Sequence, residues 1–136
     1  SEDARAALEA LIVERSLPAL KDQDFGVFCE EVGHLQARMG DYFAARQGGI
    51  FTSPRVGVVL EVLRAAGVTG LGQSSWGPTG FAFAESESEA KRLFEIASEA
   101  DTSASLRLVL AGGRNEGAEI THLRGRDAKN LGSSGI

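Results

Sequence analysis

The most informative stretch of the sequence is residues 70–80, Gly-Leu-Gly-Gln-Ser-Ser-Trp-Gly-Pro-Thr-Gly, which lead into the alternating run Phe-Ala-Phe-Ala at 81–84. Its four glycines give the backbone access to positive φ and let a ligand approach the main chain closely. Hairpin connections commonly need only about two to five residues, so this polar loop is longer than a turn requires. We therefore predict a ligand-facing loop that ends in a strand.

The loop falls short of two common phosphate-binding motifs. Gly72 and Gly77 have the spacing of a P-loop, but Pro78 occupies the position of the lysine that reaches the phosphates. A dinucleotide-binding fingerprint needs a third glycine and a following helix, which are not predicted here. Two interpretations stay open from spacing alone. In the first, the backbone N–H groups and serine hydroxyls form a nest around an anion or polar ligand. In the second, the loop is a long hairpin connection in which Trp76 covers the core.

Composition and charge restrict the class of protein. The chain has 136 residues, a formal net charge of −5, and a single cysteine, Cys29. This length fits one domain, and no apolar run reaches the length of a membrane span. Nucleic-acid binding draws on clustered positive charge, which a net negative chain lacks. A lone cysteine excludes an internal disulfide and is in keeping with a reducing cytoplasm. We expect a cytoplasmic domain that binds neither nucleic acid nor membrane.

The two ends of the sequence carry further expectations. The chain begins Ser-Glu-Asp-Ala and its only methionine is Met39, so no natural initiator is present. We therefore expect a processed chain or an excised part of a longer protein. Residues 124–136 are polar and glycine-rich, a composition typical of disordered termini. The predicted organisation is one domain over residues 1–123, followed by a disordered tail.

Three helices are predicted before the loop. The first covers residues 2–15 and ends because Pro18 pushes the preceding residue out of the helical region. The second begins after an N-cap at Asp24 and runs to about residue 46. The third covers residues 54–66, after an N-cap serine and with a proline at its first position.

Gly26, Gly33 and Gly40 recur every seven residues along the second helix. Each glycine inside a helix costs about 1 kcal/mol relative to alanine. Three glycines on one face therefore indicate that another backbone approaches closely. We predict that another helix, or a second copy of the chain in a homodimer, packs over this stripe.

Four strands and one further helix complete the prediction. Strands over residues 68–71 and 79–84 flank the loop, and two more cover residues 106–110 and 118–123. A capping box opens a helix at Ser86, which continues to about residue 99. This order predicts an α+β domain with about four mostly antiparallel strands packed against helices.

Two other segments carry candidate site residues. Gln47, Gly48 and Gly49 end the second helix with one glycine more than a C-cap requires. They form either a tight helix stop or a second edge of the pocket, with Gln47 as a polar contact. Arg114 lies in a glycine-rich turn, where it is either a phosphate-binding guanidinium or a solvated charge.

Residues 72–79, Gly-Gln-Ser-Ser-Trp-Gly-Pro-Thr, resemble the signature of β-ribofuranosylaminobenzene 5′-phosphate synthases, within the GHMP kinase superfamily. Residues 40–49 and 114–118 are similar to two further segments of that family, in the same order. The resemblance implies a C-terminal domain with a ferredoxin-like sandwich, whose loop at 72–79 faces the active site. The substrate-binding residues expected from these segments are Gly72, Gln73, Ser74, Ser75, Trp76, Gly77, Thr79, Gln47, Gly48, Gly49 and Arg114.

The resemblance also implies an activity. Enzymes of this family join phosphoribosyl pyrophosphate to 4-hydroxybenzoate or 4-aminobenzoate, with release of CO2 and pyrophosphate, in methanopterin biosynthesis. It further implies Mg²⁺ and an N-terminal domain that supplies the rest of the site, so this chain alone is expected to be inactive. No catalytic base or metal ligand can be named from the sequence. The alternatives are the C-terminal domain of a GHMP small-molecule kinase, and a non-catalytic ferredoxin-like module for binding or dimerisation.

Overall fold

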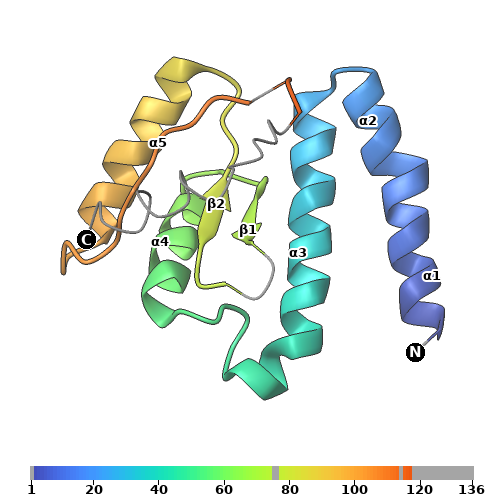
Figure 1. The fold of residues 1–136 in the computed structure, drawn as a ribbon, viewed down its shortest axis with the longest axis horizontal. Helices are drawn as coiled ribbons and strands as arrows, with labels where there is room; N and C mark the ends of the chain where they lie inside the picture. Colours follow the sequence, from blue (N-terminus) through green and yellow to red (C-terminus); the bar gives the residue numbers. More distant parts are fainter. Residues whose placement is uncertain (1, 75–76, 114, 118–136) are drawn as a thin grey trace, which may run out of the picture.

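The computed structural model of the chain describes residues 2–74, 77–113 and 115–117. Helix α3 and helices α4 and α5 lie on opposite sides of a short hairpin, and the N-terminal helices lie on the outer side of α3 (Figure 1). The elements in chain order are α1 (Glu2–Leu11), the π-helix η1 (Ile12–Ser16), α2 (Leu17–Lys21), α3 (Phe25–Gln47), α4 (Pro54–Ala65), β1 (Leu71–Gln73), β2 (Gly80–Ala82) and α5 (Glu87–Ala100).

The N-terminal helical segment continues through Pro18, so the predicted helix end at this proline is wrong. Leu17 donates its N–H to the carbonyl of Ile12, which is the wide spacing of a π-turn. Pro18 then lies in the first turn of α2. A proline is tolerated at the start of a helical segment because its missing N–H has no partner to lose there. The π-turn thus allows helical structure to continue where the local rule predicts a break.

A buried carboxylate connects this segment to α3. Glu31 of α3 is 1% exposed, and Nε of Arg15 in η1 lies 2.8 Å from its Oε1. Nδ1 of His34 lies 3.8 Å from Oε2. Neither carboxylate oxygen accepts a hydrogen bond from a described residue. The close ion pair with Arg15 is therefore the interaction that offsets the burial of this charge.

The predicted helix starts are confirmed by their N-caps. The side chain of Asp24 accepts a hydrogen bond from the N–H of Val27 at 3.0 Å. Ser86 accepts in the same way from Glu89 at 3.2 Å, and Ser53 is the N-cap of α4. These signals are local, because the cap and the N–H that it satisfies are only a few residues apart.

The glycines of α3 face other parts of the same chain. A Cβ on Gly33 would collide with the carbonyl oxygen of Thr69, and one on Gly40 would lie 2.5 Å from the side chain of Ile50. Gly26 has room, because its nearest neighbouring atom would be 3.7 Å away. The predicted close approach is thus confirmed at two of the three glycines. The neighbour at these two is not another helix, and the homodimer stays a prediction.

The hairpin is antiparallel, with Leu71 paired to Ala82 and Gln73 paired to Gly80. The core lies between this hairpin, α4 and α5. Its buried members are Val59, Leu60, Leu63, Val68, Leu71, Leu93 and Ala97. Helices packed against an antiparallel hairpin are an α+β arrangement, as predicted.

The described residues contain two strands, so the predicted third strand at 106–110 is not found. Leu106 donates its N–H to Oδ2 of Asp101 at 2.7 Å, a side chain rather than a neighbouring strand. Leu106 and Leu108 pack against the core, whereas Leu110 is 49% exposed. Leu106 and Leu108 thus contribute to the core without belonging to a paired strand. The predicted strand at 118–123 and the tail lie outside the described residues.

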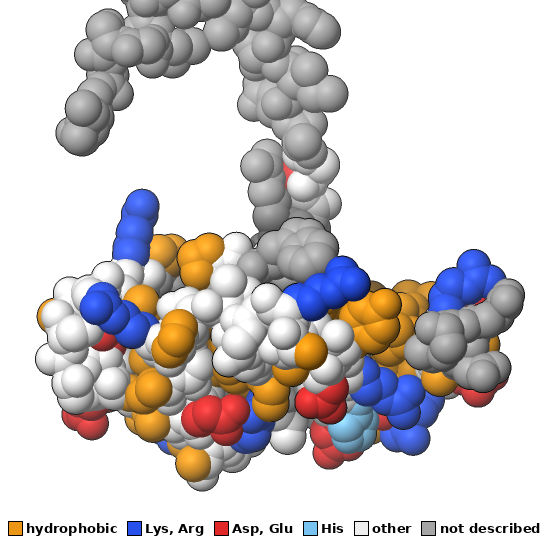
Figure 2. All heavy atoms as spheres, turned by 90° about the horizontal axis from the view of Figure 1, so that it is seen from below, with side chains coloured by type: hydrophobic (Ala, Val, Ile, Leu, Met, Phe, Trp, Pro, Cys, Tyr) orange, Lys and Arg blue, Asp and Glu red, His pale blue; other side chains and the backbone are white. Residues whose placement is uncertain are grey.

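Among the described helices, none is long and apolar enough to cross a membrane. On the face shown in Figure 2, acidic and basic side chains are interspersed with hydrophobic ones.

Replacing Gly33 with alanine should destabilise the domain by about 1–3 kcal/mol, because the new methyl group must displace a backbone carbonyl. Gly26→Ala is the matched control on the same helix. It has open space, so it should be neutral or stabilise by up to about 1 kcal/mol through helix propensity. Chemical unfolding of the two variants measures both effects, and equal stabilities would show that Gly33 is not a packing requirement.

Arg15→Met should destabilise the domain by about 1–3 kcal/mol, because it removes the guanidinium that pairs with the buried Glu31 carboxylate at 2.8 Å. Arg5→Met is the control, since it removes an exposed ion pair with Glu9 (3.7 Å) on the same N-terminal segment. That change should cost less than about 0.5 kcal/mol. Thermal unfolding at neutral pH compares the variants, and similar losses for both would contradict a special role of the buried carboxylate.

Candidate functional site

Backbone hydrogen bonds extend the hairpin into the loop that the sequence singled out. The N–H of Ser74 donates to the carbonyl of Thr79 at 2.8 Å, and the N–H of Gly77 donates to the carbonyl of Ser74 at 2.9 Å. Gly77 has φ of +72°, in the left-handed region that favours glycine. The two ends of the loop are thereby fixed to each other. Ser75, Trp76 and Arg114, three of the predicted site residues, lie outside the described residues.

Gln73 fixes this loop to the rest of the domain. Its side-chain Oε1 accepts a hydrogen bond from the backbone N–H of Thr52 at 2.8 Å. Its own backbone N–H donates to Oε1 of Gln36 on α3 at 3.1 Å. β1 is therefore connected on one side to α3 and at its end to the segment between α3 and α4. The Nε2 group of Gln73 makes no hydrogen bond with another described residue, so it can donate to a ligand.

Gln47 belongs to the same network. Its Nε2 donates to the carbonyl of Ile50 at 2.8 Å, and its Oε1 accepts from the hydroxyl of Thr52 at 3.2 Å. The two glycines after it end the helix. Gly48 has φ of +80°, and the N–H groups of Gly48 and Gly49 both donate to the carbonyl of Ala44. Of the two interpretations left open for this segment, the glycines thus match a helix stop, while Gln47 contributes a polar side chain.

A cavity of about 220 Å³ lies against this network. Its walls come from one face of α3, from the segment after α3 and from the end of β1. The lining residues are Gln36, Met39, Gly40, Phe43, Gln47, Ile50, Phe51 and Gln73. None of these described residues carries a charge, and they contribute amide and apolar groups to the walls. An apolar cavity of about 150 Å³ can hold benzene, so this cavity is large enough for one substituted aromatic ring.

The predicted site residues are only partly brought together here. Gln47 and Gln73 line the cavity, whereas the other described loop residues lie beside it. Gly72 lies against Gln36, and a Cβ at position 72 would collide with the side chain of Gln36. Gly77 packs against Thr52 and Gln73. The loop glycines therefore serve close packing, in addition to any contact with a ligand.

Sequence reasoning identified Gln47 but missed the rest of the contribution of α3 to the cavity. Gln36, Gly40, Phe43 and Gln47 follow one another at helical spacing and so share one face of this helix. That periodicity was available as a signal. It identified a glycine stripe, but not the segment that would face this stripe, because the contact of α3 with β1 is made over a long sequence separation.

The described residues of this site do not fit the Mg²⁺ ion that the resemblance implies. Mg²⁺ is held mainly by carboxylate oxygens, water and substrate phosphates. No described residue that lines the cavity carries a carboxylate, and the described part of the chain has no group of three or more His, Cys, Asp or Glu side chains arranged to hold a metal ion.

Comparison with known proteins shows the family. No curated protein and no solved structure matches the chain. The sequence matches the protein family described as GHMP kinases C terminal over residues 16–101. The match covers more than half of the 136 residues, and it includes both the hairpin loop and all residues that line the cavity. The chain therefore belongs to the family of GHMP kinase C-terminal domains.

Proposed function

We propose that this chain is the C-terminal domain of a β-ribofuranosylaminobenzene 5′-phosphate synthase. The observation that carries the proposal is the cavity whose described walls combine amide and aromatic groups, carry no charge and include Gln73 of the Gln-Ser-Ser-Trp motif. The reaction would join the anomeric carbon of phosphoribosyl pyrophosphate to the ring carbon of 4-hydroxybenzoate or 4-aminobenzoate, while CO2 and pyrophosphate leave.

The cavity suits the aromatic substrate better than the phosphorylated one. Phe43 and Phe51 offer apolar surface for a ring, and Nε2 of Gln73 offers a donor for a carboxylate or hydroxyl oxygen. A pyrophosphate group favours cationic partners, and none of the lining residues is cationic. In this proposal the domain binds the benzoate ring and orients it next to the anomeric carbon. Holding the two reacting atoms close together raises the rate of their reaction.

Several parts of the proposal concern the whole enzyme. Phosphoribosyl pyrophosphate and Mg²⁺ would be held by groups other than the described cavity residues, with an N-terminal domain supplying them. A role in methanopterin biosynthesis and the ferredoxin-like sandwich stay predictions from the resemblance, and a cytoplasmic location stays a prediction from the composition.

The family match itself favours a second candidate, the C-terminal domain of a GHMP small-molecule kinase. A glycine-rich hairpin loop and an adjacent cavity for a small acceptor are compatible with phosphoryl transfer to an alcohol as well. Consumption of ATP distinguishes this candidate from the synthase. A non-catalytic binding or dimerisation module is the third candidate, and it predicts neither reaction.

The full polypeptide that contains this domain should release CO2 from carboxyl-labelled 4-hydroxybenzoate when phosphoribosyl pyrophosphate and Mg²⁺ are both supplied. Omitting either one is the control. Absence of release, together with ATP consumption in a screen of small hydroxylated metabolites, would instead assign the protein to the kinases. Absence of both reactions would favour the binding module.

Gln73→Met should raise the KM for 4-hydroxybenzoate by about tenfold or more, because it removes a hydrogen-bonding amide from the cavity wall while roughly keeping the side-chain volume. It should also lower stability by about 1 kcal/mol through loss of the bond to Thr52. Thr102→Met, an exposed position remote from the cavity, is the control for the new side chain. An unchanged KM in a folded Gln73→Met enzyme would show that this cavity does not bind the benzoate.

A further inference from the structure

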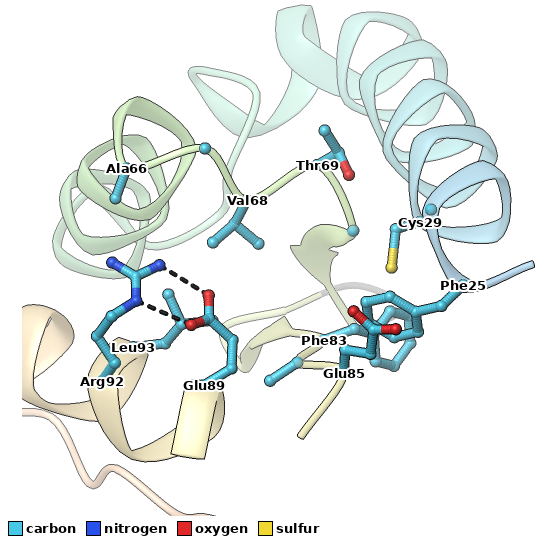
Figure 3. A pocket seen from close by; sticks show the side chains of 14 residues that line it. Phe25, Cys29, Ala66, Val68, Thr69, Phe83, Glu85, Glu89, Arg92 and Leu93 are labelled. Carbon is cyan, nitrogen blue, oxygen red and sulfur yellow. Dashed lines mark hydrogen bonds and ion pairs between the residues drawn. The ribbon is translucent and has the colours of Figure 1, made fainter. Parts of the chain in front are cut away.

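A second cavity, of about 320 Å³, lies at the opposite end of α3 (Figure 3). Its walls come from the start of α3, the turn between α4 and β1, the chain that follows β2 and the first turns of α5. It shares no lining residue with the cavity beside the loop. At a rise of about 1.5 Å per residue, the two lie roughly 20 Å apart along α3. The second cavity is therefore a separate site.

Aromatic and aliphatic side chains form much of its wall. Phe25 from α3 and Phe83 from the chain after β2 line it together with the buried Val68 and Leu93. Phe83 is 39% exposed, although its ring lies 5.9 Å from that of Phe28 between centroids. Aromatic contact thus holds this ring in place while leaving part of it open to a ligand.

Among the described residues, two carboxylates line the cavity, and only one of them has a described cationic partner. Glu89 forms two hydrogen bonds with the guanidinium of Arg92, at 2.8 and 2.7 Å. In Figure 3 the carboxylate of Glu85 lies on the other side, close to Phe25 and Cys29. Glu85 makes no hydrogen bond or ion pair with another described residue. Burial, and then the charge of Glu85, raises the pKa of the Cys29 thiol, so the negative charge acts on the inner end of the cavity.

We propose that this cavity binds a small organic cation, an ammonium group attached to an apolar or aromatic body. The ammonium group would pair with Glu85 and contact the rings of Phe25 and Phe83, whose faces attract a cation within about 6 Å. The body would lie against the aliphatic wall. An anion is disfavoured, because Glu85 repels it and the charge of Arg92 is already neutralised by Glu89. The volume is at the lower end of the range of small-molecule sites, which starts at about 300 Å³.

Two ligands of nearly the same shape test the charge requirement. Benzylammonium and benzyl alcohol are each titrated into the chain, and the backbone amide signals of the cavity residues are followed by NMR. Benzylammonium should bind saturably and at least about tenfold more tightly than the alcohol, because only the cation gains a charge-assisted bond to a carboxylate. Added salt should weaken the binding of benzylammonium and leave that of the alcohol unchanged.

Two substitutions with the same change in charge locate the site. Glu85→Gln should weaken benzylammonium binding by at least about tenfold and leave benzyl alcohol unaffected. Glu87→Gln is the matched control, because Glu87 pairs with Lys91 at 2.6 Å and does not line the cavity. It should leave both affinities unchanged. Equal affinity of the two ligands, equal effects of the two substitutions, or no saturable binding of benzylammonium would overturn the proposal.

Discussion

The contact between α3 and the segment that leads into β1 is closer than ordinary side chains allow. Gly33 on the helix admits the carbonyl of Thr69, and Gly70 on the other partner would place a Cβ only 2.6 Å from the sulfur of Cys29. Because both partners lack side chains at these points, backbone and small groups meet where large hydrophobic residues would usually pack. One edge of the hairpin is thus set against the helix, and α4 and α5 cover the other side.

This contact also decides where ligands can be accommodated. With β1 held against the middle of α3, the helix extends beyond the strand in both directions, and a cavity is present at each end. The cavity near Gln47 is uncharged and lies beside the hairpin loop. The cavity near Phe25 contains a carboxylate, that of Glu85, which has no ion-pair partner among the described residues. One helix therefore contributes to two cavities of different chemistry, each completed by a different neighbouring segment.

Features that depend on neighbouring residues were predictable from the sequence, and features that depend on distant contacts were not. The N-caps at Asp24 and Ser86 were correct because cap and partner are adjacent in sequence. Pro18 misled because the π-turn before it is not visible as a pattern. The glycine period indicated close approach at Gly33 but could not identify Thr69 as the neighbour. Of the polar groups around the loop cavity, Gln73 and Gln47 were predicted, whereas Gln36 and the ring of Phe43 on α3 required the fold.

The close contacts of the glycines differ in whether a second substitution can compensate for the loss of the glycine. Gly33 faces a backbone carbonyl, which no mutation at position 69 can remove, so a larger residue at 33 has no simple compensating partner. Gly72 instead faces the side chain of Gln36, whereas Gly70 faces both the side chain and the backbone Cα of Cys29. A smaller residue at 36 would make room for a Cβ on the strand, but no substitution at 29 removes its Cα. Among homologues, positions 36 and 72 should therefore covary, while position 33 should be invariant without a covarying partner.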